Sequence, residues 1–225
     1  MWIWILLGTI ACTLFIKERL NHRNLRAVFY KVATSICFFL MAWQGLFSCH
    51  HLSFGLWILV GLFFGFLGDL WLALKWAYPK QDTMFTFTGF ISFALEHFFI
   101  LMGLVIRTEQ PILLMLSLLM AMICSYLVVG MEEKMKLKYG LFKGITLIYG
   151  SLLGSIPFYG FFLTISNNFK ALYPFVCIAG LLFLASDLIL SGTYFGKENK
   201  RFLFILNHIL YFIAQFLLAY ITWIC

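Results

Sequence analysis

Charged residues are scarce in this chain of 225 residues. Asp, Glu, Lys and Arg together supply 11% of the residues, whereas 63% are hydrophobic and 20% are aromatic. This composition lies outside the range of soluble domains and within that of polytopic membrane proteins. Because a membrane-spanning helix needs about 20 residues, eight spans would use most of the chain. No soluble domain is expected, so any chemistry must come from the helices and their short connections.

Familiar signatures of soluble enzymes are also absent. The chain has no GxSxG, P-loop or GxGxxG motif and no HxxxH or HExxH spacing, so neither a nucleophile elbow, nor a nucleotide loop, nor a helical zinc site is predicted. The cysteines lack CxxC spacing and mostly lie in apolar stretches, which predicts small core residues rather than disulfides or zinc ligands. They are Cys12, Cys37, Cys49, Cys124, Cys177 and Cys225. We expect no metal and no cofactor, with zinc as the alternative because five histidines and several acids are present.

Apolar runs and their punctuation predict eight transmembrane helices. The expected spans are residues 2–16, 28–47, 53–74, 84–106, 111–129, 141–165, 171–191 and 202–224. All but two of the 16 Lys and Arg residues lie in the odd-numbered connections, the exceptions being Arg107 and Lys170. Cytoplasmic connections carry the excess of basic residues, so both termini are expected on the non-cytoplasmic side. The prediction is an all-α polytopic membrane protein, a bundle of eight helices forming a single domain over residues 1–225.

The net charge of +7 is explained by the same membrane topology. Because the basic residues are confined to short loops, where topology requires them, no nucleic-acid partner is expected. The expected partner is the lipid bilayer, and the expected location is a multi-pass position in it, with a bacterial cytoplasmic (inner) membrane as the default. The oligomeric state stays open.

Two aspartates lie alone inside apolar helices. Asp69 stands in LFFGFLGDLWLAL and Asp187 in LLFLASDLIL. A carboxylate in such a position costs several kcal/mol in lipid, so it indicates function. Gly61 and Gly65 precede Asp69 by two turns and one turn, so a neighbouring helix can pack closely on the face that carries the acid. We predict that Asp69 and Asp187 are catalytic.

Further polar residues are expected at a similar depth. The helical rise puts Asp69 roughly 9 Å from the cytoplasmic end of its helix. In the fourth span Glu96 and His97 point about 100° apart, and His97 is favoured as the one that lines a cavity. The alternative is a histidine satisfied by a backbone carbonyl. The predicted positioning residues are Lys31, His97, Ser186, Asn207, His208, Tyr211 and Gln215.

Several phrases resemble the YhhN-type lysoplasmalogenase family, which includes the mammalian transmembrane-protein-86 enzymes. They are GD at 68–69, GFISFALEH at 89–97, GLLFLASD at 180–187 and YFIAQ at 211–215. The resemblance covers nearly the whole chain in order, and the paired GD and SD are its most specific part. The chain departs from the family at Glu96, usually alanine, at Val32, usually proline, and at Phe212, usually tyrosine. A more distant similarity links it to the alkaline ceramidases, which use zinc.

The resemblance implies a hydrolase that cleaves the vinyl-ether bond of lysoplasmalogens. Its products would be a fatty aldehyde and glycerophosphoethanolamine or glycerophosphocholine. The chemistry needs an acid and a base, as in the two-carboxylate glycosidases, so Asp69 and Asp187 are expected to divide these roles in an order that the sequence leaves open. The phosphate of the lysophospholipid substrate would lie near Lys31 or Lys143.

Two other functions fit the same residues. One is a zinc-dependent, ceramidase-like lipid amidase, and the other is a small transporter or lipid-binding protein whose aspartates carry protons. The absence of inverted repeats counts against transport. If the acids are catalytic, Asp69→Asn and Asp187→Asn are expected to be at least as stable as the parent, because each removes the burial of a charge.

Overall fold

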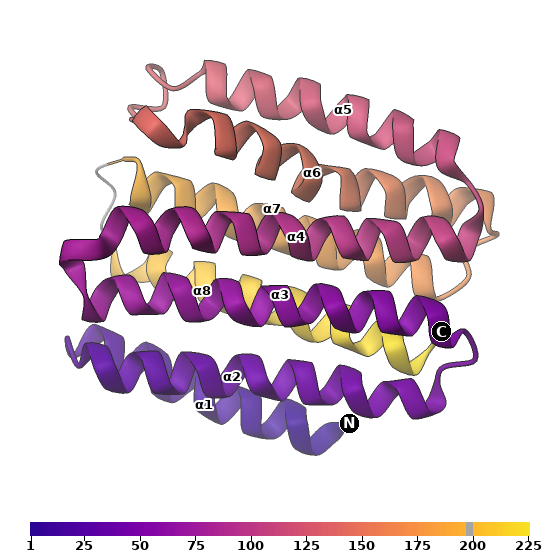
Figure 1. Ribbon diagram of the computed structural model, residues 1–225, viewed down its shortest axis with the longest axis horizontal. Coiled ribbons are helices and arrows are strands. Elements are labelled where there is room, and N and C mark those ends of the chain that lie inside the picture. Colours follow the sequence, from indigo (N-terminus) through magenta and orange to yellow (C-terminus); the bar gives the residue numbers. More distant parts are fainter. Residues whose placement is uncertain (197–199) are drawn as a thin grey trace. The chain divides into compact units, whose positions relative to one another are not determined.

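The computed structural model describes residues 1–196 and 200–225, and within them the chain is helical without any strand (Figure 1). The helices are α1 (Trp2–Leu20), α2 (Asn24–Gly45), α3 (Leu52–Ala77), α4 (Asp82–Thr108), α5 (Pro111–Gly130), α6 (Lys143–Ser166), α7 (Leu172–Tyr194) and α8 (Arg201–Tyr220). Each predicted span coincides with one helix, with ends that differ by about a turn. Lys197, which contributed to the topology prediction, lies outside the described residues.

Seven helices of the described chain are long and apolar enough to cross a membrane. The eighth, α1, falls short because its last turns continue past the predicted apolar span and include Lys17, Glu18 and Arg19. The all-α, multi-pass membrane fold is therefore confirmed, together with association with a lipid bilayer. The side on which the termini lie stays a prediction.

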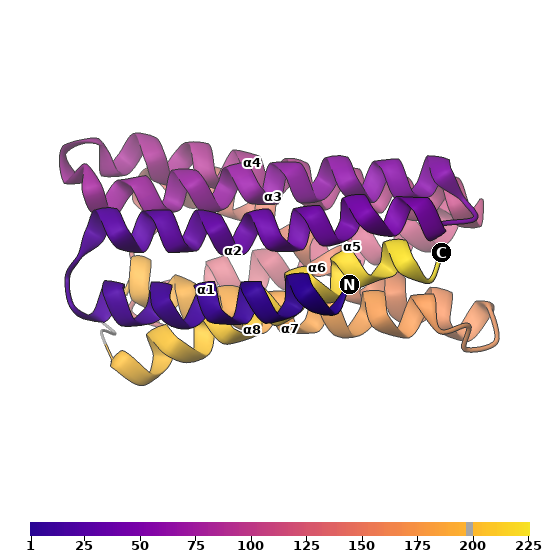
Figure 2. The same cartoon turned by 90° about the horizontal axis from the view of Figure 1, so that it is seen from below.

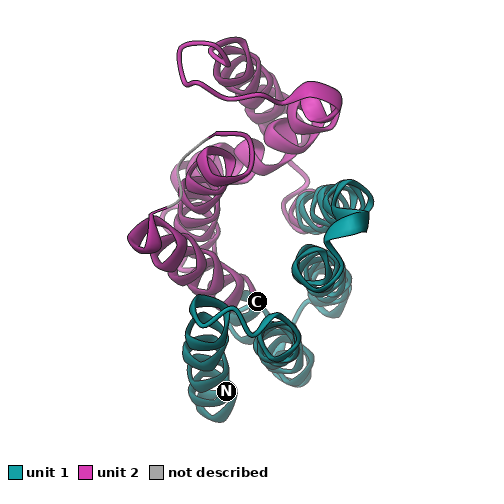
Figure 3. Cartoon of the chain, turned by 90° about the vertical axis from the view of Figure 1, so that its left-hand side faces the viewer, with its two compact units in different colours: residues 1–103, 219–225 teal, residues 104–218 magenta. Residues whose placement is uncertain are grey.

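The chain divides into two compact units (Figure 3). Unit 1 contains residues 1–103 and 219–225, and unit 2 contains residues 104–218. In unit 1, α1 packs on α2 and α2 packs on α3. Figures 1 and 2 show α1 and α2 side by side. The single-domain assignment stays a prediction.

Glycines bring α3 and α4 close together within unit 1. A Cβ atom on Gly61 would lie 3.0 Å from the backbone oxygen of Glu96, and one on Gly68 would lie 2.8 Å from the Phe93 ring. On Gly65 it would lie 2.5 Å from Oε1 of Glu96. A larger residue at these positions would push the helices apart. The prediction that the glycine face of α3 packs closely against another helix is confirmed.

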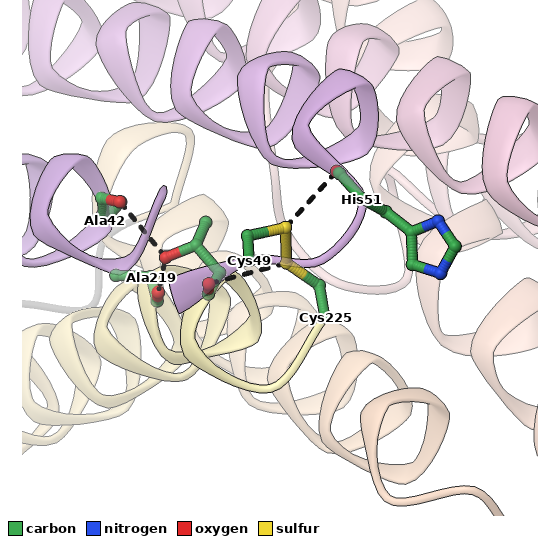
Figure 4. The surroundings of a disulfide bond; sticks show 6 residues. Ala42, Cys49, His51, Ala219 and Cys225 are labelled. Carbon is green, nitrogen blue, oxygen red and sulfur yellow. Dashed lines mark hydrogen bonds between the residues drawn. A yellow bond between two sulfur atoms is a disulfide. The ribbon is translucent and has the colours of Figure 1, made fainter. Parts of the chain in front are cut away.

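A disulfide joins Cys49 to the C-terminal Cys225 within unit 1 (Figure 4). The hydroxyl of Thr222 donates to the carbonyl of Ala42 over 3.1 Å, and the Trp223 indole N–H donates to the carbonyl of Met41 over 3.0 Å. The prediction that all six cysteines are core residues rather than disulfides was wrong for this pair. The cysteines lie 176 residues apart, and they meet because the 3₁₀ turn η4 (Ile221–Trp223) packs on the end of α2.

In unit 2, α6 packs between α5 and α7. The α5–α6 connection folds back on the end of α7, where the Lys138 N–H donates to the carbonyl of Phe195 over 2.8 Å. Tyr139 in this connection is buried, and its hydroxyl lies 3.2 Å from the Ser191 hydroxyl. The connection is thus an ordered cap rather than an open loop.

Candidate active site

Asp69 is held by two side chains from α2. Nζ of Lys31 lies 3.0 Å from Oδ1 of Asp69, and the Ser35 hydroxyl donates to Oδ2 over 2.5 Å. Lys31 and Ser35 are four residues apart, so both point from one face of α2 toward α3. The expectation that Lys31 and Asp69 share one level of the bundle is met by direct contact between them.

This ion pair is almost completely withdrawn from solvent. The Asp69 side chain is 0% exposed and that of Lys31 is 5% exposed. Such a pair loses several kcal/mol per ion in desolvation and persists when geometry and additional hydrogen bonds compensate. The Ser35 hydroxyl supplies one such bond. The carboxyl group of Asp69 thus lies against an ammonium and a hydroxyl donor, an arrangement that suits a base or a group that stabilises a developing cation.

Glu96 and His97 are both completely buried in α4. The carboxyl group of Glu96 packs over Gly65, one turn from Asp69 on α3. Nδ1 of His97 lies 2.5 Å from the carbonyl oxygen of Phe93. Because a carbonyl accepts hydrogen bonds and does not donate them, Nδ1 carries the proton. This bond matches the alternative of a histidine satisfied by a backbone carbonyl, and a cavity-lining role for His97 stays a prediction.

Asp187 occupies a second cluster, in unit 2. The Tyr149 hydroxyl from α6 donates to Oδ2 of Asp187 through a short hydrogen bond. The Ser186 hydroxyl lies 3.4 Å from Oδ1 of Asp187, and the side-chain amide of Asn207 donates to the Ser186 carbonyl over 2.7 Å. Tyr149 was missed in the sequence because a single tyrosine in an apolar run is ordinary. The structure thus places two predicted residues, Ser186 and Asn207, next to a predicted aspartate.

The predicted polar face of α8 is buried. Gln215 is 0% exposed, and its amide nitrogen donates to the Tyr211 hydroxyl over 3.0 Å. Oε1 of Gln215 has no hydrogen-bond partner among the described residues. Nδ1 of His208 lies 2.8 Å from the Phe204 carbonyl oxygen. A buried amide oxygen of this kind calls for a donor from water or substrate.

Metal ligands are not clustered in the part of the chain that the structure describes. Within it, no three His, Cys, Asp or Glu side chains lie close enough to hold a metal ion together. The polar groups instead form hydrogen-bonded clusters around one carboxylate each, with Asp69 in unit 1 and Asp187 in unit 2.

Buried carboxylates on long apolar helices define a polytopic membrane protein with a polar interior. The YhhN family model matches residues 26–221, and the chain belongs to the YhhN family. This confirms the resemblance seen in the sequence, and the match covers Asp69, Asp187 and their described partners. No curated protein and no solved structure matches the chain. Residues 1–25, which include α1, lie outside the matched range.

Proposed function

We propose that this membrane protein hydrolyses the vinyl-ether bond of lysoplasmalogens. Membership of the YhhN family supports a membrane hydrolase. The observation that carries the proposal is the buried Lys31–Asp69 pair, because it provides an ionised carboxylate inside an apolar bundle. A second carboxyl group, at Asp187, has a hydroxyl partner in Tyr149, so the two acids have different surroundings.

The reaction requires one acid and one base. The acid gives a proton to the β-carbon of the vinyl ether, whose double-bond electron pair forms the new C–H bond and leaves an oxocarbenium ion. Water then attacks the α-carbon and loses a proton to the base, which gives a hemiacetal. Collapse of the hemiacetal breaks the bond between this carbon and the glycerol oxygen and forms the C=O bond of the aldehyde. The hemiacetal hydroxyl loses its proton in this step, and the glycerol oxygen takes up a proton. The products are a fatty aldehyde and the glycerophosphodiester.

In this proposal Asp69 is the ionised member of the pair of acids. The Lys31 ammonium lies against this carboxylate, which can stabilise the oxocarbenium ion and accept the proton from water. The role of proton donor then falls to Asp187. Its Tyr149 partner is a neutral hydroxyl, whereas the partner of Asp69 is a cation. Lys31 serves Asp69 rather than the substrate phosphate.

The remaining predicted residues position water or substrate. Oε1 of Gln215 is buried without a partner in the described chain, and it can accept a hydrogen bond from the attacking water. The Gln215–Tyr211 hydrogen bond fixes the orientation of that amide. Ser186 and Asn207 orient Asp187. The rings of His97 and His208 each bind a backbone carbonyl of their own helix.

A comparison of two substrates tests the proposal. Purified protein is incubated in detergent with a lysoplasmalogen and with its saturated 1-alkyl analogue, and fatty aldehyde is measured. Aldehyde from the alkenyl lipid alone is the expected result, because a saturated ether has no double bond to protonate. If neither lipid yields aldehyde, the proposal is wrong. Loss of activity with a chelator and its recovery with zinc would favour a zinc hydrolase instead.

A further inference from the structure

The α5–α6 connection, residues 131–142, is fixed on unit 2 by two buried side chains (Figure 1). Leu137 is 5% exposed and Tyr139 is 2% exposed. The Tyr139 ring lies against the Phe195 ring at the end of α7, with centroids 4.8 Å apart, and the Lys138 N–H donates to the Phe195 carbonyl over 2.8 Å. The backbone of this connection therefore has a defined place, from which its exposed side chains extend.

Three of these exposed side chains are lysines, namely Lys134, Lys136 and Lys138. Lys138 is exposed although both of its neighbours in the chain are buried. Within the described part of the chain, none of the three ammonium groups forms an ion pair or a side-chain hydrogen bond. Their positive charges are therefore available to a partner outside the protein.

The acids of the same stretch do not neutralise these lysines. Oε2 of Glu132 lies 3.1 Å from Nζ of Lys143, the first residue of α6. Oε1 of Glu132 accepts the Tyr139 N–H over 2.9 Å, so both of its oxygens are engaged. Glu133 is the other acid, and residues 131–143 contain four lysines against two glutamates, which gives the stretch a net charge of +2.

The connection is expected at the level of the lipid head groups, because it joins two segments that are long and apolar enough to cross a membrane, Pro111–Gly130 and Gly140–Ser166. Apolar side chains lie among the lysines in the sequence. Leu141 is 91% exposed, and Met131 and Met135 are 45% and 41% exposed. At a bilayer surface such residues insert toward the acyl chains, while the long stems of lysines carry the ammonium groups to the phosphates.

We propose that Lys134, Lys136 and Lys138 bind the phosphate of an anionic phospholipid in the surrounding bilayer. This inference goes beyond the proposed function, since the lipid bound here is not cleaved. A zwitterionic head group would bring its own cation beside the lysines, whereas an anionic head group brings only negative charge. Each basic residue at an anionic lipid surface strengthens binding by up to about fivefold. The anchored backbone also reduces the entropy that is lost when the lipid binds.

Native mass spectrometry tests the site. The protein is purified in detergent and mixed with equal amounts of phosphatidylglycerol and phosphatidylcholine that have the same acyl chains, and the ratio of the two bound lipids is measured. The parent is expected to retain an excess of phosphatidylglycerol. Because salt screens exposed charges, each single Lys→Gln substitution at 134, 136 or 138 is expected to lower the ratio about twofold, and the triple variant roughly five- to tenfold.

Two further variants serve as controls. Lys170→Gln changes an exposed lysine in the connection between α6 and α7, at the opposite end of α6, and is expected to leave the ratio unchanged. Replacing all three lysines of the site by arginine keeps the charge and should keep the parental ratio. Hydrogen exchange of the Tyr139 amide is measured in every variant, and unchanged protection shows that the connection is still anchored.

A parental ratio in the triple Lys→Gln variant would overturn the proposal, and so would an equal fall in Lys170→Gln. A lower ratio together with lost protection of the Tyr139 amide would also overturn it, because the lysines would then hold the connection rather than a lipid. If inorganic phosphate at millimolar concentration displaces phosphatidylglycerol, the lysines bind a soluble anion and not a lipid. No lipid is cleaved in this measurement, so its result is independent of aldehyde release.

Discussion

Lys31 and Asp69 form an ion pair between α2 and α3 in which Nζ lies 3.0 Å from Oδ1 and the Asp69 side chain is completely buried. This contact changes the expected consequence of removing the acid. With a charged partner in contact, Asp69→Asn leaves a buried ammonium without its counter-charge. The sequence-based expectation that Asp69→Asn is at least as stable as the parent is therefore revised, whereas the same expectation is kept for Asp187.

Asp69→Asn is expected to lower the free energy of unfolding by about 3–5 kcal/mol, the usual cost of removing one partner of a buried pair. Lys31→Met with Asp69→Asn is expected to recover most of this loss, because both charges are then gone. Reversible denaturation in detergent micelles measures both variants. An Asp69→Asn variant as stable as the parent would show that the ion pair does not contribute to the free energy of unfolding.

Gly65→Ala is expected to destabilise unit 1 by about 1–3 kcal/mol, because its methyl group would lie 2.5 Å from Oε1 of Glu96. Adding Glu96→Ala, which removes the carboxyl group that meets this methyl group, should relieve the clash and restore stability. Gly144→Ala in α6 is the matched control, since nothing lies within 4 Å of its added Cβ. Equal effects of the Gly65 and Gly144 substitutions in thermal denaturation would contradict close packing of α3 on α4.

Because Cys49 and Cys225 form a disulfide, neither is expected to react with a maleimide reagent until the protein is reduced. Replacing both cysteines by serine should lower stability by about 2–4 kcal/mol, whereas Cys124→Ser, at a free and exposed cysteine, should have little effect. Disulfides persist in oxidising compartments, so the bond also supports the proposal that the C-terminus is non-cytoplasmic. Ready labelling of Cys225 without reductant would argue against the bond.

Glu132 gives the α5–α6 connection a pH-dependent anchor. It accepts the Tyr139 backbone N–H over 2.9 Å and contacts Nζ of Lys143 at 3.1 Å, and these interactions lower the pKa of Glu132 below its ordinary value of 4.5. A lowered pKa means that the folded connection is stabilised above about pH 4.5, and that this contribution is lost as pH falls through the folded pKa.

Hydrogen exchange of the Tyr139 amide measures this anchor. Protection in the parent should exceed that in Glu132→Gln at neutral pH, and the two should converge in acid, because protonated glutamate resembles glutamine. A constant difference across the pH range would show that charge plays no part in holding the connection.

The helices could be predicted from the sequence because each span is a long apolar run bounded by charged or turn residues. Asp69 and Asp187 were equally visible, since an acid is conspicuous in such a run. The residues that contact these two aspartates were harder to predict. Lys31 was expected at the level of Asp69, but direct contact depends on how α2 and α3 are rotated against each other. Hydropathy does not report that rotation.

Other contacts left no signal in the sequence. Tyr149 lies in an apolar segment where a tyrosine is unremarkable, yet it donates to Asp187. The sequence predicts Cys49 and Cys225 as core residues because no spacing rule connects two cysteines so far apart. In each case the function of a residue depends on a neighbour from a distant part of the chain.

The central claim, that the two aspartates carry the chemistry, is tested most directly by the rate of aldehyde release from Asp187→Asn compared with Gln215→Ala. Asp187 is half-buried with a neutral hydroxyl in contact, so its Asn variant should fold with parental stability. Loss of a general acid should lower the rate by about two to four decades, and loss of the Gln215 amide by clearly less. A folded Asp187→Asn protein that releases aldehyde at the parental rate would contradict the account.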